Sequence, residues 1–389
     1  MHLREIRELV RIQRPPAPYG VRRLARCVSV EDVARLARRR LPAAASGYLD
    51  GGGEDEWTLR RNRAAFDNAA LLPHVLRDVS DIDTSATLLG TPSPVPFALA
   101  PVGAPRVFHH EGELAAARAA HRAGVPYAVS TLGTQRIEDI AAAGGALWFQ
   151  LYVWGDRGLA KELIARAGAL GYRALLVSVD TSLRSKRERE ERTGLSLPSP
   201  NLTARSVLEA ALRPSWSWHF LTTPAITFPN VDGATTLADM FDGTVSWHDV
   251  EWIRHSWDGP LALKGVLNPD DAERAAEAGV DAVIVSNHGG RQLDHLPATL
   301  DALPAVVDAV GDRVEVLMDS GIRRGTDIVT ALASGARGVL VGRAYLYGLA
   351  AAGEAGVRHV IDILTDELRV ALGLCGASRL ADLDASLLQ

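Results

Sequence analysis

Eight short apolar runs recur between Phe97 and Gly342, and most of them end at a polar residue. Runs of this length, rich in small and β-branched side chains and bounded by turn formers, are typical of strands that are buried on both faces. They span Phe97–Pro101, Tyr127–Ser130, Leu147–Tyr152, Ala174–Asp180, Leu261–Lys264, Asp281–Val285, Val314–Asp319 and Gly338–Gly342. The repetition indicates one sheet of parallel strands.

Segments with helical spacing fall between or after these runs. They span Gly112–Ala123, Gly158–Ala169, Asp270–Ala278, Thr326–Ala333 and Glu354–Leu372. Eight strands that alternate with helices over about 250 residues predict an α/β fold of the (β/α)8 TIM-barrel type. An open, doubly wound sheet is the alternative, but the GxGxxG motif of a dinucleotide-binding sheet does not follow the first run.

Residues 1–27 form a basic N-terminal extension ahead of this domain. Residues 1–40 carry eleven Arg against four acidic residues, although the whole chain has a net charge of −5. Leu3, Ile6 and Leu9 share one face of a helical pattern that ends at a Pro-Pro pair. The pattern predicts a short basic helix that either lies on an anionic lipid surface or docks against protein.

Residues 28–389 form the predicted barrel domain, and one interval inside it lacks the alternation of strands and helices. This insertion, at about residues 184–245, follows the fourth strand and contains a charged run and then the aromatic sequence Trp216-Ser217-Trp218-His219-Phe220. Long insertions at this face of a barrel usually bind ligands or cover a site. The aromatic side chains therefore either enter a membrane interface or pack beneath the insertion.

Composition places the chain among soluble globular proteins, with 47% hydrophobic and 23% charged residues. Cys27 and Cys375 are the only cysteines, so we expect neither a disulfide framework nor a metal site. No apolar run is long enough to span a membrane, and the N-terminus lacks the features of a signal peptide. We expect a cytoplasmic protein, peripheral on the inner face of the cell membrane if it contacts lipid, with no nucleic-acid partner.

The sequence SNHGGRQLD follows the sixth run, at Ser286–Asp294. His288 supplies a titratable base, Arg291 a fixed cation, and the two glycines between them a closely approaching backbone. A hydrogen-bonded polar loop is the alternative interpretation, but the active sites of TIM barrels are assembled from the C-terminal ends of strands. The motif therefore predicts a base beside an anion-binding arginine.

Two glycine-containing basic turns follow the last two runs, at Asp319–Gly325 and at Gly342-Arg343. Backbone N–H groups exposed by glycine bind anions, and the loops after strands seven and eight are the usual phosphate site of this fold. A phosphorylated cofactor or substrate is expected there. Lys264, which ends an apolar strand, also needs an anionic partner.

These motifs resemble those of a known family. SNHGGRQLD, YLDGGGEDE at Tyr48–Glu56 and DSGIRRG at Asp319–Gly325 are similar to signatures of the FMN-dependent L-2-hydroxy acid dehydrogenases and oxidases. The similarity is greatest to the bacterial L-lactate dehydrogenases that use a quinone. It implies FMN as the cofactor, a small 2-hydroxy acid as the substrate and a homotetramer as the assembly. O2 is the alternative acceptor, and a larger, mandelate-like acid is the alternative substrate.

The resemblance also implies roles for individual positions. His288 would take the hydroxyl proton, Asp180 would orient His288, and Tyr152 would hydrogen-bond the developing oxyanion. The residues that bind the substrate would be Tyr48, Tyr152, Arg187 and Arg291. Contacts to FMN are implied for Pro101, Val102, Gly103, Ser130, Gln150, Ser178, Lys264, Asp319, Gly321, Arg323, Gly342 and Arg343.

The chain departs from the family pattern after the fourth strand. The Pro, Gly and Asp of V-D-x-P-x-x-G-x-R-x-x-D are replaced by Ser182, Ser185 and Glu190, and Arg184 and Lys186 are additional cations. We hypothesise that this added charge binds a second acidic group on the substrate. A solvated charged loop is the alternative.

Two further departures lie beside the expected flavin. Gly103 stands where short-chain oxidases often carry Ala, and Leu132 where glycolate oxidase carries Trp. Both changes remove volume and predict room for oxygen or for a bulkier substrate. An FMN-dependent isomerase acting on a phosphorylated isoprenoid and a catalytically silent binding barrel are the remaining alternatives, but neither requires His288, Arg291 and Arg187 together.

Overall fold

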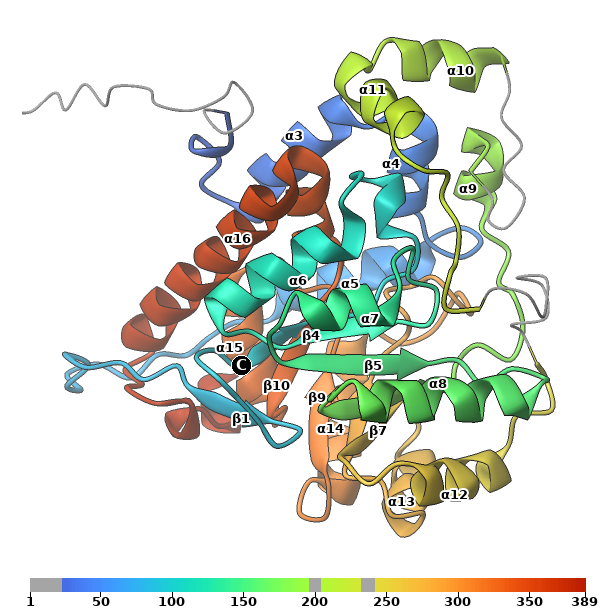
Figure 1. The fold of residues 1–389 in the computed structure, drawn as a ribbon. Helices are drawn as coiled ribbons and strands as arrows, with labels where there is room; N and C mark the ends of the chain where they lie inside the picture. Colours follow the sequence, from blue (N-terminus) through green and yellow to red (C-terminus); the bar gives the residue numbers. More distant parts are fainter. Residues whose placement is uncertain (1–22, 196–203, 232–241) are drawn as a thin grey trace, which may run out of the picture.

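The computed structural model describes residues 23–195, 204–231 and 242–389, so the basic helix predicted near the N-terminus lies outside the described residues. Eight parallel strands close into a barrel in the order β10-β3-β4-β5-β6-β7-β8-β9 (Figure 1). Each strand overlaps one predicted run, so the TIM-barrel prediction is confirmed and the doubly wound alternative is wrong. The strands are β3 (Phe97–Leu99), β4 (Tyr127–Ser130), β5 (Leu147–Leu151), β6 (Ala174–Ser178), β7 (Leu261–Val266), β8 (Ala282–Val285), β9 (Glu315–Met318) and β10 (Gly338–Val341).

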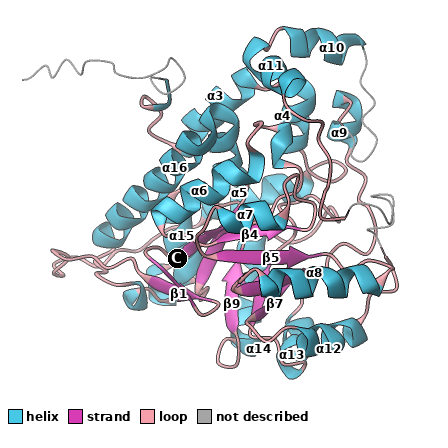
Figure 2. Cartoon of the chain, viewed as in Figure 1, coloured by secondary structure: helices cyan, strands magenta, loops and turns pink. Residues whose placement is uncertain are grey.

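Helices surround the barrel and alternate with its strands (Figure 2). All five predicted helices are present, but α16 begins at Arg343 rather than at Glu354, because two helices join at a kink where Gly353 has φ +60°. This extension places a helix N-terminus beside Gly342. The surrounding helices are α6 (Gly112–Ala123), α7 (Ile137–Ala142), α8 (Arg157–Ala169), α12 (Trp247–Ser256), α13 (Pro269–Glu277), α14 (Thr299–Val310), α15 (Gly325–Ala333) and α16 (Arg343–Leu374).

Three helices precede the barrel: α3 (Val30–Arg40), α4 (Ala43–Asp50) and α5 (Trp57–Asn68). Helix α3 packs along α16 (Figure 1). Helix α5 lies against the loop that follows β8, where Asn62 Nδ2 donates to Asn287 Oδ1 at 2.9 Å. Helix α4 ends at the glycine-rich turn and carries Tyr48 to the mouth of the barrel.

A hairpin that the sequence pattern did not predict covers the opposite end of the barrel. It consists of β1 (Ala86–Leu88) and β2 (Thr91–Ser93), and Leu88 packs into the barrel core with Trp148. Trp148 Nε1 donates to Thr91 Oγ1 at 3.1 Å. Neither strand of the hairpin forms a continuous apolar run, because their sequences are ATL and TPS, whereas the equally short β3 reads FAL.

The insertion after β6 forms three short helices, α9 (Glu188–Thr193), α10 (Ala204–Ala211) and α11 (Pro214–Thr222). Packing beneath the insertion is confirmed for Trp216, whereas entry into a membrane interface stays a prediction. Trp216 packs beneath the insertion and donates from Nε1 to Val107 O at 2.9 Å, whereas Trp218 is 68% exposed. Within the residues that the structure covers, no helix combines the length and the apolarity needed to cross a membrane.

Candidate active site

A cavity of about 1380 Å³, including its open mouth, lies at the C-terminal ends of the barrel strands. The predicted site residues come from many separate segments of the chain, yet all of them except Asp180 and Ser130 line this one space. They are Tyr48, Pro101, Val102, Gly103, Gln150, Tyr152, Ser178, Arg187, Lys264, His288, Arg291, Asp319, Gly321, Arg323, Gly342 and Arg343.

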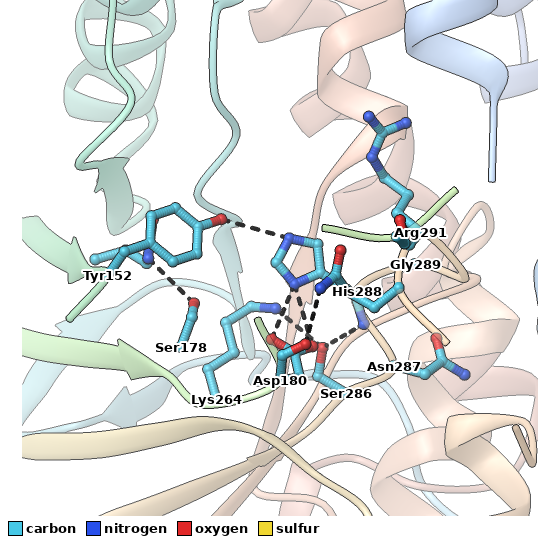
Figure 3. Close-up of polar contacts among 12 residues, drawn as sticks. Tyr152, Ser178, Asp180, Lys264, Ser286, Asn287, His288, Gly289 and Arg291 are labelled. Carbon is cyan, nitrogen blue, oxygen red and sulfur yellow. Dashed lines mark hydrogen bonds and ion pairs between the residues drawn. The ribbon is translucent and has the colours of Figure 1, made fainter. Parts of the chain in front are cut away.

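His288 follows β8 with a left-handed backbone, φ +57°, which turns its ring toward β6. Its Nδ1 lies 3.1 Å from both carboxylate oxygens of Asp180, and its Nε2 lies 3.5 Å from the Tyr152 hydroxyl (Figure 3). Asp180 thereby holds the proton on Nδ1 and leaves Nε2 free to accept one.

Asp180 lies behind His288 and remains ionised. Burial alone would raise the pKa of Asp180, but the facing His288 ring and the nearby Lys264 ammonium together lower it. No sequence pattern pointed to Gly265, which has φ +110° and whose added Cβ would lie 2.6 Å from Asp180 Cβ. A side chain at position 265 would therefore displace the carboxylate from His288.

Lys264 finds its anionic partner inside the protein. Its Nζ lies 2.7 Å from Asp319 Oδ2 and donates to Ser286 Oγ at 2.9 Å, and all three residues are buried. The sequence argument correctly required an anion here but did not identify Asp319 or Ser286. Because Lys264 also lines the cavity, its charge is held rigidly at the cavity floor.

A chain of neutral hydrogen bonds crosses the strand ends beside Lys264. Ser130 Oγ donates to Gln150 Oε1 at 2.9 Å, and Gln150 Nε2 donates to Ser178 Oγ at 3.1 Å. The Ser130 side chain therefore lies behind Gln150. Its role in this geometry is to orient the Gln150 amide.

Two arginines meet at the cavity mouth around Glu190, a residue that the sequence marked only as a departure from the family. Arg291 Nη2 lies 2.6 Å from Glu190 Oε1, and its guanidinium stacks over the Tyr48 ring at 4.9 Å. Arg187 Nη1 lies 3.9 Å from Glu190 Oε2, and Arg187 Nη2 donates to Gln292 Oε1 at 3.2 Å. One carboxylate against two guanidiniums leaves a net positive charge for a bound anion.

The Gly342 end of the cavity also carries positive charge and adjoins the first arginine pair, because Arg343 and Arg291 both donate to Gly51 O. Arg343 donates to the carbonyl oxygens of Leu49, Gly51 and Gly289, which are neutral acceptors. Burial, with the neighbouring Arg291 charge, lowers the pKa of Arg343 to about 10. An anion here would remove this electrostatic cost, and the N-terminus of α16 adds its dipole.

The backbone at this end is shaped for close approach. Gly321 has φ +100°, and its added Cβ would lie 2.8 Å from Asn62 O and 2.9 Å from the Phe66 ring. Arg323 lines the same end of the cavity. Glycine turns, a helix N-terminus and two arginines form a donor set that fits the phosphate of FMN, with Lys264 and Gln150 where a flavin ring would extend.

Apolar side chains form the wall of the cavity next to Tyr152. They include Leu132, Phe108 and Phe228, and Phe228 comes from the insertion and was not predicted. Of the two additional cations, Arg184 lines the cavity, whereas Lys186 pairs with Glu188 at 2.8 Å. The hypothesis of a second anion site therefore depends on Arg184.

Comparison with known proteins gives a consistent result. A family described as FMN-dependent dehydrogenase matches residues 37–389. A putative L-lactate dehydrogenase of Mycobacterium tuberculosis is 42% identical over 98% of this chain and 94% of its own length. An L-lactate dehydrogenase of Caulobacter vibrioides is 45% identical over 92% of this chain and 97% of its own length.

Solved structures also match over nearly the whole chain. One is a monotopic membrane protein, (S)-mandelate dehydrogenase, with a TM-score of 0.89, 37% identity and coverage of 94% of this chain and 99% of its own. Another is mandelate oxidase with (S)-2-phenylpropionate, with a TM-score of 0.81, 39% identity and coverage of 93% and 98%. The chain belongs to the FMN-dependent dehydrogenase family and is an FMN-dependent enzyme.

Proposed function

We propose that this enzyme oxidises an L-2-hydroxy acid, with L-lactate as the first candidate, to the 2-oxo acid and passes the electrons to a quinone. One observation carries the proposal: the His288–Asp180 pair and the two guanidiniums of Arg187 and Arg291 converge on one cavity. This arrangement can hold a carboxylate and remove a proton from the neighbouring hydroxyl.

Each residue has a definite task in this proposal. Arg187 and Arg291 bind the substrate carboxylate and fix the α-carbon below His288. His288 Nε2 takes the hydroxyl proton, and Asp180 stabilises the imidazolium that forms. Burial raises the pKa of Tyr152, so its hydroxyl stays protonated and donates to the developing oxyanion. Bound FMN would accept the α-hydrogen together with its two electrons.

The choice of L-lactate rests on the curated relatives, which carry that name. A larger, mandelate-like acid is the second candidate, because Phe108, Leu132 and Phe228 give the cavity an apolar wall and two of the solved neighbours are named for mandelate. O2 is the alternative acceptor.

The apolar outer face of the insertion supports a quinone and a peripheral position on the membrane. Leu208, Leu212, Trp218 and Leu221 are largely exposed on α10, α11 and the turn between them. Aromatic and leucine side chains of this kind partition into the membrane interface, where an apolar quinone is dissolved.

Anaerobic mixing of the holoenzyme with L-lactate, (S)-mandelate and the D-isomers tests the proposal. We expect the L-substrates to bleach the yellow flavin and the D-isomers to leave it unchanged. Readmission of air or addition of menadione then identifies the acceptor by the rate at which the colour returns. An unchanged spectrum with every hydroxy acid would contradict the proposal and favour an isomerase or a silent barrel.

A further inference from the structure

A second cavity of about 830 Å³, including its open mouth, lies next to the first, between α11 and the loop that follows β3. Its walls include the aromatic rings of Phe108, Trp216 and Phe220, and the rings of Trp216 and Phe220 stack with centroids 4.8 Å apart. Its size and apolar character suit a small organic ring. The reaction described above does not use this space.

Three histidines supply the polar groups of this second cavity. The His110 and His219 rings stack with centroids 4.0 Å apart, and His109 lies 4.3 Å from His110. His110 Nδ1 is buried and has no hydrogen-bond partner among the described residues. Buried polar atoms in native proteins are usually paired, so a ligand oxygen is a natural partner for this nitrogen.

His109 and His110 are neutral near pH 7. Burial, with the charge of neighbouring groups, lowers the pKa of His109 to about 3 and also lowers the pKa of His110. A neutral imidazole donates one N–H, which suits a carbonyl oxygen better than it suits an anion.

The two arginines that line this cavity have structural tasks. Arg40 Nη1 donates to Ala351 O at 2.7 Å, and Arg106 donates to the carbonyl oxygens of Pro224 and Ala225. The Arg40 bond joins α3 to α16, and the Arg106 bonds fasten the insertion to the barrel. His110 Nδ1 is therefore the polar atom of this wall that is left without a partner among the described residues, and it reaches a ligand when the ring turns toward the cavity.

Phe108 connects the two cavities, because it forms part of both walls. On the side of the first cavity, Phe108 stacks with Tyr48 at a centroid distance of 5.7 Å. On the outer side, Phe220 and Leu221 line the second cavity and are exposed, Leu221 to 79%. The second cavity thus runs from the wall of the flavin cavity to the apolar face of the insertion.

We propose that this second cavity binds the ring of a quinone, with one quinone carbonyl oxygen accepting a hydrogen bond from His110 and the ring packed against Trp216 and Phe220. The inference rests on the proposed function and locates its electron acceptor. The quinone takes two electrons from the reduced flavin and two protons, so both C=O groups become C–OH. Its apolar tail leaves along the exposed face of α10 and α11.

A metal ion fits this cluster less well. The nitrogens of His109 and His110 and an oxygen of Glu111 lie within 4.8 Å of one another. Glu111, however, already pairs with Arg118, and its backbone N–H donates to His109 Nδ1 at 3.4 Å. The His110 and His219 rings lie one over the other with 9° between their planes. An imidazole binds a metal ion in the plane of its ring, so one ion cannot lie in the planes of both rings.

The kinetic test uses holoenzyme whose flavin has been photoreduced without any hydroxy acid, so that failure of the proposed substrate chemistry does not affect it. Menadione is mixed in anaerobically and the return of flavin colour is followed. We expect His110→Phe, which keeps the ring stack but loses the N–H, to lower the rate constant about five- to tenfold. His110→Gln, which restores a donor, should recover most of the rate, and Ala225→Trp should block the cavity.

A binding measurement on the oxidised holoenzyme gives a readout other than activity. Menadione should bind to the wild type and quench Trp216 fluorescence, with a Kd raised about five- to tenfold in His110→Phe. His248→Phe, on the exposed face of α12, is the matched control and should behave as the wild type. Equal rates and equal affinities in all variants would overturn the inference, as would tight binding of Zn²⁺ alone that excludes menadione.

Discussion

The cavity at the strand ends and the histidine-lined cavity share Phe108 but hold their polar groups in different ways. In the first, the groups stand on strand ends and are paired within the barrel, as Lys264 is with Asp319 at 2.7 Å. In the second, they stand on a loop and on an inserted helix, and His110 Nδ1 lacks a partner among the described residues. A rigid scaffold suits bond-breaking chemistry, whereas an inserted segment can change its partner without disturbing that chemistry.

The largest expected effect concerns the first cavity alone. His288→Gln keeps a polar side chain at the end of β8 but removes the base, so we expect flavin reduction by the hydroxy acid to slow by about 10²–10⁴-fold. Anaerobic stopped-flow absorbance measures this rate. Reoxidation of the photoreduced enzyme by menadione should stay within about twofold of the wild type if the two cavities work separately.

The control for this substitution is His248→Gln on the exposed face of α12, which should reduce its flavin at the wild-type rate. A His288→Gln enzyme that retained a tenth of the wild-type rate would show that another group accepts the proton.

A second substitution tests the backbone that shapes the phosphate end of the first cavity. Gly321→Ala places a Cβ 2.8 Å from Asn62 O at a residue with φ +100°. The loop must shift, and we expect FMN to bind about 10²-fold more weakly. Quenching of FMN fluorescence on titration with the apoprotein measures the Kd.

Gly171→Ala is the matched control for backbone strain without a steric clash. Gly171 also has a positive φ, +77°, but its added Cβ meets no atom within 4 Å. It should lower stability by about 1 kcal/mol and leave FMN affinity unchanged. If the two variants bind FMN equally well, the close approach at Gly321 has no role in cofactor binding.

The difference between barrel strand ends and the insertion also explains which site residues could be predicted from sequence. The strands, and the gathering of His288, Lys264 and Arg343 at one face, follow from local apolar runs and from the rule that barrel strands share a C-terminal end. Glu190 and Phe228 could not be placed, because their contacts depend on how the insertion folds back. The burial of Lys264 required a nearby anion. That this anion is Asp319, which follows β9, depends on the order of the strands in the barrel.

The second cavity had no local signature at all. His109 and His110 follow β3 and His219 belongs to α11, so their stacking arises from a contact between segments far apart in the chain. The hairpin of β1 and β2 escaped prediction for a different reason, since polar residues interrupt both of its short strands.

Lowering the pH should weaken the packing around the second cavity and leave the first cavity unchanged. The pKa of His109 is lowered to about 3 by burial and by the charges of His110, Arg40, His219 and Arg118. At pH values between the ordinary histidine pKa and about 3, His109 binds a proton when α11 is detached or the chain is unfolded. In the packed cluster, His109 does not bind this proton. Stability of the α11 contact therefore falls as the pH falls, by about 2 kcal/mol at pH 5.

Hydrogen exchange along α11, corrected for the intrinsic rate, measures this loss. The pKa of Asp180 is lowered, so its contribution is fully present above the ordinary Asp value and is lost only below it. Exchange at β6 should consequently stay constant from pH 7.5 to 5 while α11 opens. His109→Gln should flatten the pH dependence of α11, and an α11 that is equally protected at both pH values would contradict the assignment.

The smallest effect concerns the apolar wall of the first cavity. Gly103→Ala adds a methyl group whose Cβ would lie 3.2 Å from Leu132 Cβ, which is tighter than an ordinary contact. The wall must move toward the substrate, so we expect kcat/KM for (S)-mandelate to fall about tenfold and that for L-lactate by less than about twofold. Leu132→Ala in the same chain relieves the contact and should restore mandelate oxidation. Equal losses for both substrates would mean that Gly103 faces the cofactor rather than the substrate side chain, and the volume argument for a bulky acid would then fail.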